Sequence, residues 1–352
     1  MVDNKAKFTV ILPTHNRSDI LPFAIESVLY QTEQNFELLI VGDGCTDNTS
    51  AVVQEYLKDE RIKWFDLPKA SGFGYANRNK VFKKAKGKYI AFAAHDDILF
   101  PDHLEVLGKT LDESPEIDIV MSRALWIGED GIVIPCPYNI NNSDIFDVFM
   151  NIGNGIAASC VMHRNEVYKK IGFWNDKLPS AADWDFWKRI ISSKNSRNYE
   201  FLGIETVLHF KANWRSNSTQ LTYKMDKVFS FFHKFDIQFP ENLKVKMRKG
   251  KSEQEIFWSN IKENKNFLRN LRMNSQAFLD SFMQTFLPMS FDKIISIENE
   301  INKNKSEIEK LQNEIAMLSG SFFFRLRNKL LIIFPKNSMQ YKLMKKIINI
   351  VR

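Results

Sequence analysis

Short apolar runs alternate with amphipathic stretches over the first 125 residues. Continuous apolar segments, each followed by a stretch of helical periodicity, are typical of a mostly parallel sheet with both faces covered. The predicted strands are Phe8–Leu12, Phe36–Val41, Ile62–Phe65 and Tyr89–Ala93, and the predicted helices span about 18–30, 47–57 and 75–85. The sequence therefore predicts an α/β fold whose ligands bind at the carboxyl ends of the strands.

The pattern changes after the apolar segment Ile117–Leu125. Glu129-Asp130-Gly131 between apolar residues predicts a hairpin. Residues 135–155 are rich in Pro, Asn and Gly, which predicts a mobile loop. Regular structure is expected again from about 156 to 223, and the composition of 223–289 is that of a helical region.

A heptad repeat begins at Ile294. The heptad has two seam positions. The first is occupied by Ile294, Ile301, Ile308 and Ile315, and the second by Ile297, Asn304, Leu311 and Leu318. Seven of these eight residues are apolar, which predicts a coiled coil and hence a homo-oligomer, a dimer before a trimer. The alternative is an amphipathic helix packed on the domain, but the other faces are too rich in Glu, Lys and Asn for that.

Charge is concentrated at the end of the chain. The net charge is +7, yet residues 321–352 hold eight Lys and Arg and no acidic residue, leaving −1 for the remainder. This distribution argues against nucleic-acid binding by the body of the protein. In the tail, apolar runs such as Leu330–Phe334 lie among the cations, which predicts peripheral contact with an anionic membrane. Packing of these apolar residues on protein is the alternative.

Composition fits a globular protein, with 44% hydrophobic and 26% charged residues. Cys45, Cys136 and Cys160 lack metal-ligand spacing, so we expect neither disulfides nor a zinc site, and a reducing compartment. The polar start of the chain predicts no signal peptide, and no apolar run reaches the roughly 18 residues of a spanning helix. A cytoplasmic location is therefore expected, at the inner face of the membrane.

Polar clusters follow three of the predicted strands. They are Pro13-Thr14-His15-Asn16-Arg17, Gly42-Asp43-Gly44 and Ala94-His95-Asp96-Asp97. Because carboxyl ends of parallel strands share one edge, the clusters should meet there. Asp43 can accept a nucleobase N–H, Asp96 can hold Mg²⁺ or Mn²⁺ together with substrate phosphates, and Arg78 can reach a phosphate or the base.

Six segments in order resemble family 2 glycosyltransferases of the GT-A fold over about residues 8–218. They are VILPTHNR, SVLYQT, LLIVGDGCTDNT, ANRN, GKYIAFAAHDDILFPDHL and AADWDFWKRI. The resemblance implies a metal-dependent, inverting transfer of a sugar from a nucleotide-sugar, expected to be a UDP-sugar, to a glycan acceptor that is expected to be lipid-linked. Polysaccharide or glycoconjugate synthesis is the expected context.

The resemblance assigns roles residue by residue. Asp183 corresponds to the general base, and Asp96 to the metal-binding carboxylate, with Asp97 and His209 as further candidate ligands. The donor-binding candidates are Pro13, Thr14, Asn16, Asp43, Arg78, His95, Asp96 and Arg215. For His209 a structural role is the alternative.

Three positions depart from the family pattern. Ala94, Gly42 and Ala182 stand where relatives often have a carboxylate. Two other functions therefore stay open. One is a catalytically weak nucleotide- or glycan-binding scaffold that oligomerises through its coiled coil. The other is a dinucleotide-binding oxidoreductase, which the incomplete glycine pattern Gly72-Phe73-Gly74 disfavours.

The predicted organisation has four parts. Residues 1–222 form the GT-A domain, 223–290 a helical extension, 291–320 the coiled coil and 321–352 the basic amphipathic tail.

Overall fold

The structure is a computed structural model that describes residues 6–128, 130–151, 153–210 and 240–280 of the 352-residue chain. The described residues fall into two compact units. The first contains 6–128, 130–138, 156–210 and 244–272, and the second contains 139–151, 153–155, 240–243 and 273–280. The predicted site residues lie in the first unit, except for Arg215, which is outside the described residues.

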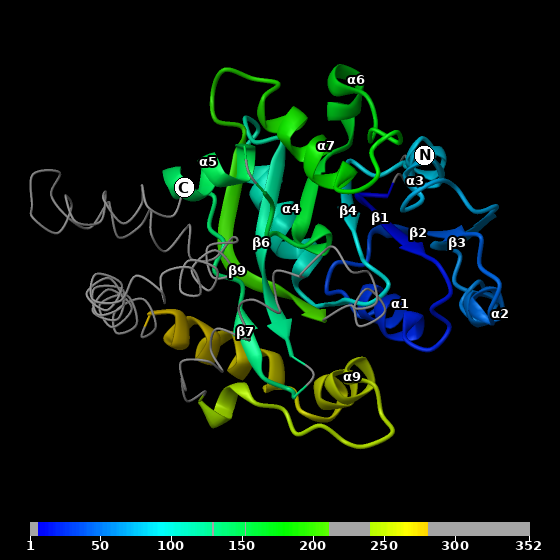
Figure 1. Cartoon of the computed structure of the whole chain (residues 1–352), viewed down its shortest axis with the longest axis vertical. Coiled ribbons are helices and arrows are strands. Elements are labelled where there is room, and N and C mark those ends of the chain that lie inside the picture. The colour runs from blue at the N-terminus through cyan, green and yellow to red at the C-terminus, as the bar shows by residue number, and fades with distance from the viewer. Residues whose placement is uncertain (1–5, 129, 152, 211–239, 281–352) are drawn as a thin grey trace, which may run out of the picture. The chain divides into compact units, whose positions relative to one another are not determined.

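The first half of the sheet is parallel, as the alternating pattern predicts (Figure 1). Strands pair in the order β3-β2-β1-β4, each parallel to its neighbour. The helices between them place all four carboxyl ends at one edge. The elements are β1 Phe8–Thr14, α1 Leu21–Leu29, β2 Phe36–Asp43, α2 Thr49–Gln54, β3 Ile62–Leu67, α3 Tyr75–Phe82 and β4 Tyr89–Phe92.

The second half of the sheet is mixed, which corrects the prediction of a mostly parallel sheet. The order continues from β4 through β8, β6 and β9 to β5, with β7 beside β6. Among the described strands, four pairings are parallel and four antiparallel. The elements are β5 Ile98–Leu99, α4 His103–Glu113, β6 Ile119–Ile127, β7 Val133–Pro135, β8 Val161–Arg164, α6 Tyr168–Ile171, α7 Ala182–Ile191 and β9 Tyr199–Phe210.

Residues 133–155 contain two elements. The predicted hairpin is present, since β6 and β7 pair antiparallel and Gly131 takes a φ of 78° at the turn. The predicted loop is wrong in part, because helix α5 spans Ser143–Asn151 in the second unit. Ile145, Val148 and Phe149 are buried at helical spacing. The neighbouring Pro and Asn residues concealed this short stripe in the sequence.

Helices follow the sheet, in agreement with the helical composition. Helix α9 spans Glu253–Glu263, and residues 267–280 are also helical. Ser252 caps α9 by accepting a hydrogen bond from the backbone of Glu255 at 3.1 Å. Phe257 packs edge-to-face on Phe210 of β9, with 5.4 Å between ring centroids, so α9 belongs to the first unit. The predicted coiled coil and basic tail lie outside the described residues.

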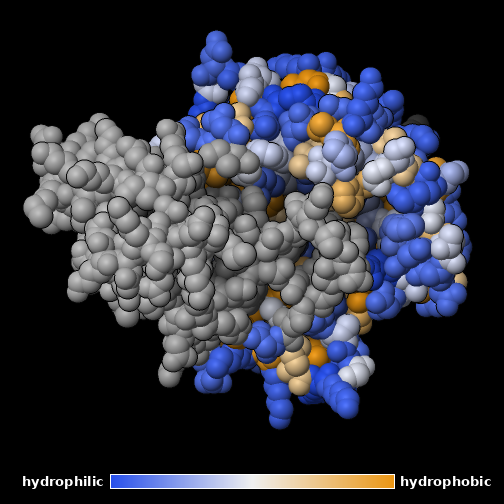
Figure 2. All heavy atoms as spheres, viewed as in Figure 1, coloured by the Kyte–Doolittle hydropathy of each residue, from blue (hydrophilic) through white to orange (hydrophobic). Residues whose placement is uncertain are grey.

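The part of the chain that the structure describes holds no helix long and apolar enough to span a bilayer. On the face shown in Figure 2, the described surface is mainly hydrophilic, with apolar residues scattered among polar ones.

Two buried histidines make the fold sensitive to acid. His103 and His163 are fully buried, and burial lowers the pKa of each to about 4. Nδ1 of His103 lies 2.8 Å from Oγ1 of Thr206. In the unfolded chain both imidazoles take up a proton near pH 6.5, whereas the folded protein resists this down to about pH 4. Stability is therefore lost as pH falls through that interval.

We expect the thermal unfolding midpoint to drop progressively between about pH 6.5 and about pH 4. His103→Gln keeps a hydrogen-bonding group for Thr206 but does not titrate, so it should reduce the steepness of this loss. Differential scanning calorimetry across that range measures both effects. A midpoint that stays constant from about pH 7 to about pH 5 would contradict the assignment.

Candidate active site at the carboxyl edge of the sheet

Side-chain to backbone contacts tie together the ends of β1, β2 and β4, as the strand order predicts. Nδ1 of His15 lies 2.8 Å from the carbonyl oxygen of Asp43, and Nδ1 of His95 lies 3.2 Å from that of Pro13. The Asn16 side chain accepts a hydrogen bond from the backbone of Thr46 at 2.7 Å. Of the predicted donor-binding residues, Pro13 and Asn16 thus hold the loops after the strands in place.

Asp43 is the centre of the first half of this edge. Its carboxylate accepts hydrogen bonds from the backbone of Ala70 at 2.9 Å and from Nδ2 of Asn77 at 2.7 Å, both at Oδ1. Nζ of Lys69 donates to Oδ2. Burial raises the pKa of Asp43, but the hydrogen bonds from Lys69, Ala70 and Asn77 outweigh it and hold that pKa below its usual value. Asp43 is therefore ionised and acts as an acceptor.

Gly74 allows the backbone to lie directly against Asp43. Its φ is 75°, in the left-handed region, and a Cβ atom there would lie 2.6 Å from Oδ2 of Asp43. A side chain would therefore collide with the carboxylate as well as strain the backbone. The segment before α3 is fitted to Asp43, although the pattern of Gly72 and Gly74 does not form a dinucleotide fingerprint.

Arg78 on α3 lies beside two aromatic rings that also contact each other. Its guanidinium carbon is 5.1 Å from the ring centre of Tyr75 and 5.3 Å from that of Trp174. Nδ2 of Asn79 donates to the carbonyl oxygen of Trp174 at 2.7 Å, and the backbone of Trp174 donates to Oδ1 of Asn79 at 3.1 Å. The double hydrogen bond holds Trp174 in place, and the two cation–π contacts restrain the arginine, as a phosphate- or base-binding role requires.

The turn after β4 has a buried and an outer carboxylate. Asp97 is 2% exposed, and its two oxygens contact Oγ of Ser159 at 2.5 Å and Nδ1 of His209 at 2.7 Å. Oγ of Ser159 also accepts from the backbone of Ala94 at 2.9 Å. Asp97 thus braces the turn and holds His209, and the outer carboxylate belongs to Asp96.

His95 and Asp96 complete the turn. Nε2 of His95 lies 3.9 Å from Oδ2 of Asp96, and burial lowers the pKa of His95. Helix α9 reaches the same place, since Nε2 of Gln254 donates to the carbonyl oxygen of Asp96 at 3.2 Å. Helix α9 therefore helps to position the backbone of the candidate metal ligand.

The donor set fits a divalent cation bound jointly with a substrate. Strands β5 and β9 pair with Ile98 opposite Leu208, which brings the Asp96 turn beside His209. Holding Nδ1 of a histidine with a carboxylate directs its Nε2 toward a metal, an arrangement common around metal sites. The described residues contain no group of three or more His, Cys, Asp or Glu side chains placed so that they could hold a metal ion by themselves. Asp96 and His209 would thus share the ion with phosphate oxygens and water.

Asp183 stands in the first turn of α7. Ala181 precedes the helix with a φ of 58°, and Oδ1 of Asp183 accepts from the backbone of Trp184 at 2.8 Å. An ionised carboxylate is favoured at a helix N-terminus. The chain leading into α7 lies against the loop before α3, because a Cβ at Gly72 would lie 3.6 Å from the carbonyl oxygen of Pro179. Asp183 therefore follows a segment that borders the Asp43 side of the edge.

Thr14 has a buried side-chain hydroxyl that is unsatisfied among the described residues. The residue is 2% exposed at the end of β1, and its Oγ1 has no hydrogen-bond partner among the described residues. Such a hydroxyl is costly unless it is satisfied, so a role in binding fits it. Arg215 lies outside the described residues, and its predicted role stays a prediction.

Four residues of this edge were not identified from the sequence. They are Lys69, Asn77, Ser159 and Gln254, and each acts by holding a predicted site residue. Asn77 lies inside the ANRN segment, so its position was a usable signal. The other three reach the site through tertiary contacts, which no local pattern records. The sequence separations are 26 residues for Lys69 and Asp43, 62 for Ser159 and Asp97, and 158 for Gln254 and Asp96.

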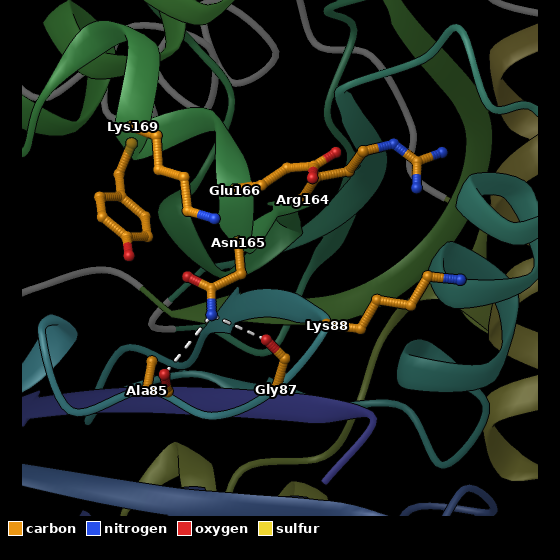
Figure 3. A pocket seen from close by; sticks show the side chains of 8 residues that line it. Ala85, Gly87, Lys88, Arg164, Asn165, Glu166 and Lys169 are labelled. Carbon is orange, nitrogen blue, oxygen red and sulfur yellow. Dashed lines mark hydrogen bonds between the residues drawn. The ribbon is translucent and has the colours of Figure 1, made fainter. Parts of the chain in front are cut away.

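A pocket of about 350 Å³ lies at the opposite end of β4 (Figure 3). Asn165 crosses it and donates to the carbonyl oxygens of Ala85 at 3.5 Å and Gly87 at 2.8 Å. Arg164 donates to three carbonyl oxygens, and Lys88 pairs with Asp112. The pocket flanks the amino end of β4, and is therefore separate from the site around Asp43 and Asp96.

The fold resembles that of solved glycosyltransferases. Over 79% of this chain and 92% of the other, it aligns with Staphylococcus aureus TarS residues 1–349, crystallised with UDP-GlcNAc, at a TM-score of 0.50 and 18% identity. At this identity the likeness concerns the fold alone. It defines the class as a GT-A glycosyltransferase fold, a mixed α/β sheet with its polar strand ends gathered at one edge.

Sequence comparison then gives the family. Residues 9–172 match the model of glycosyl transferase family 2. The match confirms the resemblance seen in the motifs and decides against the oxidoreductase alternative.

Curated relatives are also named as glycosyltransferases. An uncharacterized one from Rickettsia conorii is 43% identical over 196 residues, covering 55% of this chain and 31% of the relative. Another from Methanocaldococcus jannaschii is 26% identical over 314 residues, covering 87% and 97%. TuaG of Bacillus subtilis, named for teichuronic acid biosynthesis, is 40% identical over 106 residues, covering 30% and 42%. The chain thus spans about a third of the Rickettsia relative's length.

Proposed function

We propose that this chain transfers a sugar from a nucleotide-sugar, a UDP-sugar, to a glycan acceptor in the synthesis of a surface polysaccharide or glycoconjugate. The family domain and the names of relatives such as TuaG support this proposal. The complex of TarS residues 1–349, a protein of similar fold, with UDP-GlcNAc supports a nucleotide-sugar donor.

The observation that carries the proposal is the joining of two half-sites at one edge of the sheet. Asp43 and Arg78 provide an acceptor and a cation where a base and its phosphates can lie. The Asp96 turn provides a metal-binding carboxylate, and His15 and His95 connect the strand ends between them. A nucleotide-sugar has its base, its phosphates and its sugar in that order. It therefore needs a base-binding acceptor, a cation for the phosphates and a metal-binding carboxylate one after another along the edge.

The proposed reaction is a direct displacement at the anomeric carbon with inversion. Asp183 takes the proton from the acceptor hydroxyl as that oxygen attacks, a role that contributes about 10²–10⁴-fold. Arg78 and Arg215 hold the donor's phosphates. Asp96 and His209 would hold Mn²⁺ or Mg²⁺, which as a Lewis acid offsets negative charge on a leaving nucleoside diphosphate. Asp97 orients His209 through the 2.7 Å hydrogen bond.

A catalytically weak scaffold that binds nucleotide or glycan is the second candidate. It is favoured by Ala94, which leaves the turn after β4 without the first carboxylate that relatives often have. A screen of nucleotide-sugars for hydrolysis with and without Mn²⁺ separates the two. We expect hydrolysis of one UDP-sugar that depends on the metal, whereas binding without any turnover would favour the scaffold.

We also propose that the protein works at the inner face of the cytoplasmic membrane on a lipid-linked acceptor. The support is the sequence of the 321–352 tail, where eight cations accompany apolar runs. Each cation near an anionic leaflet is worth about 1 kcal/mol, enough for peripheral binding. We expect the full chain to sediment with anionic liposomes, less so at high salt, and a chain ending at 320 to stay in solution. No sedimentation by the full chain at low salt would contradict the anchor.

A homo-oligomer formed through the heptad region at 291–320 remains part of the proposal. The apolar seam of that segment supports it.

A further inference from the structure

Lys69 occupies a polar position beside the base-binding carboxylate. Its Nζ contacts Oδ2 of Asp43, the carbonyl oxygen of Ala70 at 3.2 Å and that of Gly72 at 3.3 Å. An ammonium group has three N–H donors, and here each has an acceptor. The Lys69 side chain is nevertheless 46% exposed, whereas that of Asp43 is 10% exposed. Lys69 therefore lies between the buried carboxylate and the surface from which a ligand would approach.

The hydrogen bonds already made limit what Asp43 can still accept. An ionised carboxylate offers about four acceptor positions. Oδ1 receives two donors, from Ala70 and Asn77, and Oδ2 receives one, from Lys69. One acceptor position thus remains, and it is on the oxygen that Lys69 contacts. A ligand at Asp43 can place a single N–H there, with the ammonium directly beside it.

We propose that Asp43 and Lys69 act as a pair that recognises a nucleobase with one ring N–H next to a ring carbonyl, as in uracil. Lys69 is then a specificity-determining residue for the nucleotide of the donor. The proposal rests on the proposed function, because it concerns the base of the nucleotide-sugar. Asp43 accepts the ring N–H at its remaining position. Lys69 donates to the adjacent base carbonyl in place of one of its two loop carbonyls.

The pair of Asp43 and Lys69 disfavours guanine and cytosine, which carry exocyclic amino groups. Guanine presents two neighbouring N–H groups and needs two acceptors, of which Asp43 has one left. Cytosine presents a bare ring nitrogen, an acceptor, where uracil has its N–H. An ionised Asp43 cannot donate to that nitrogen. Lys69 helps to exclude cytosine, because its hydrogen bond opposes the effect of burial and keeps the pKa of Asp43 low.

A purely structural brace is the competing role for Lys69, and the chain offers a matched control for it. Lys63 of β3 pairs with Glu37 of β2 at 3.0 Å, with side-chain exposures of 43% and 7%. This is the same kind of pair, between a half-exposed lysine and a buried carboxylate, and the carboxylate lies on β2 in both cases. Glu37 takes no part in the candidate site. Loss of Lys63 therefore measures what loss of such a brace does by itself.

The test measures binding of UDP, GDP and CDP with Mg²⁺ by isothermal titration calorimetry. The full-length chain is compared as wild type, Lys69→Met, Lys69→Arg and Lys63→Met, at about pH 8 and about pH 5.5. We expect the wild type to prefer UDP over CDP and GDP by about tenfold or more at both pH values. Lys69→Met should lose most of this preference, and its affinity for UDP should fall further at the lower pH. Lys69→Arg should retain the preference, and Lys63→Met should bind like the wild type.

The outcomes separate the two proposals. If the wild type prefers UDP and Lys69→Met keeps the same preference at both pH values, Lys69 is only a brace and this inference is wrong. If Lys63→Met lowers the preference as much as Lys69→Met, the effect is one of loop stability, and the inference is again wrong. If the wild type binds no nucleoside diphosphate, the proposed function itself fails and the inference fails with it.

Discussion

Replacing Asp183 with Asn is expected to lower sugar transfer by at least about 10²-fold while leaving donor binding intact. The amide keeps the size of the side chain and can still accept from the backbone of Trp184, a contact of 2.8 Å in the structure. What it loses is basicity, so no group receives the proton of the acceptor hydroxyl as its oxygen attacks the anomeric carbon. The measurement is single-turnover transfer at saturating donor, together with the dissociation constant of UDP.

Asp185 provides the matched control two residues further along α7. Its carboxylate pairs with Arg189 at 2.9 Å, and both side chains are about a third exposed. Exposed pairs of this kind contribute only about 0–1 kcal/mol, so Asp185→Asn should transfer sugar at close to the wild-type rate. Equal losses in the two variants would point to a damaged helix, and a fully active Asp183→Asn enzyme would exclude this residue as the base.

The parallel half of the fold was predictable because its signals are local. Strands β1, β2 and β4 are each largely apolar runs, and the polar residues that follow them mark the carboxyl edge. The mixed half was not, since the pairing of β6 with β8 and β9 joins residues far apart in sequence. Helix α5 was hidden by the Pro and Asn residues around it.

The candidate site, like the fold, was predictable only where its residues stand in local sequence motifs. Asp43, Asp96 and Asp183 stand in recognisable local motifs. The groups that determine how they behave come from elsewhere, as Lys69 does for Asp43 and Ser159 for the turn at Asp97. That Asp97 and His209 are metal ligands stays a prediction, and the structure adds that the two side chains contact each other at 2.7 Å. Through this contact Asp97 supports His209.

Asp96→Ala is expected to abolish metal-dependent donor binding, and EDTA should have the same effect on the wild type. Asp96 supplies the outer carboxylate of the turn, and the described residues hold no cluster of three metal-binding side chains that could replace it. With only His209 left, binding of the ion would rest almost entirely on the donor's phosphates. We expect donor affinity in the presence of Mn²⁺ to fall by about 10²-fold, to the value measured with EDTA.

Two comparisons make this result specific to the metal. Asp66 is an exposed carboxylate near the carboxyl end of β3, so Asp66→Ala removes a negative charge from the same edge and should leave binding unchanged. Asp97→Asn should lower metal affinity less than Asp96→Ala, since its amide can still contact His209 and Ser159. It should also lower the unfolding temperature, because a buried charged partner of His209 is lost. Transfer that survives EDTA at the wild-type rate would refute the metal-assisted reaction, whichever residues hold the donor.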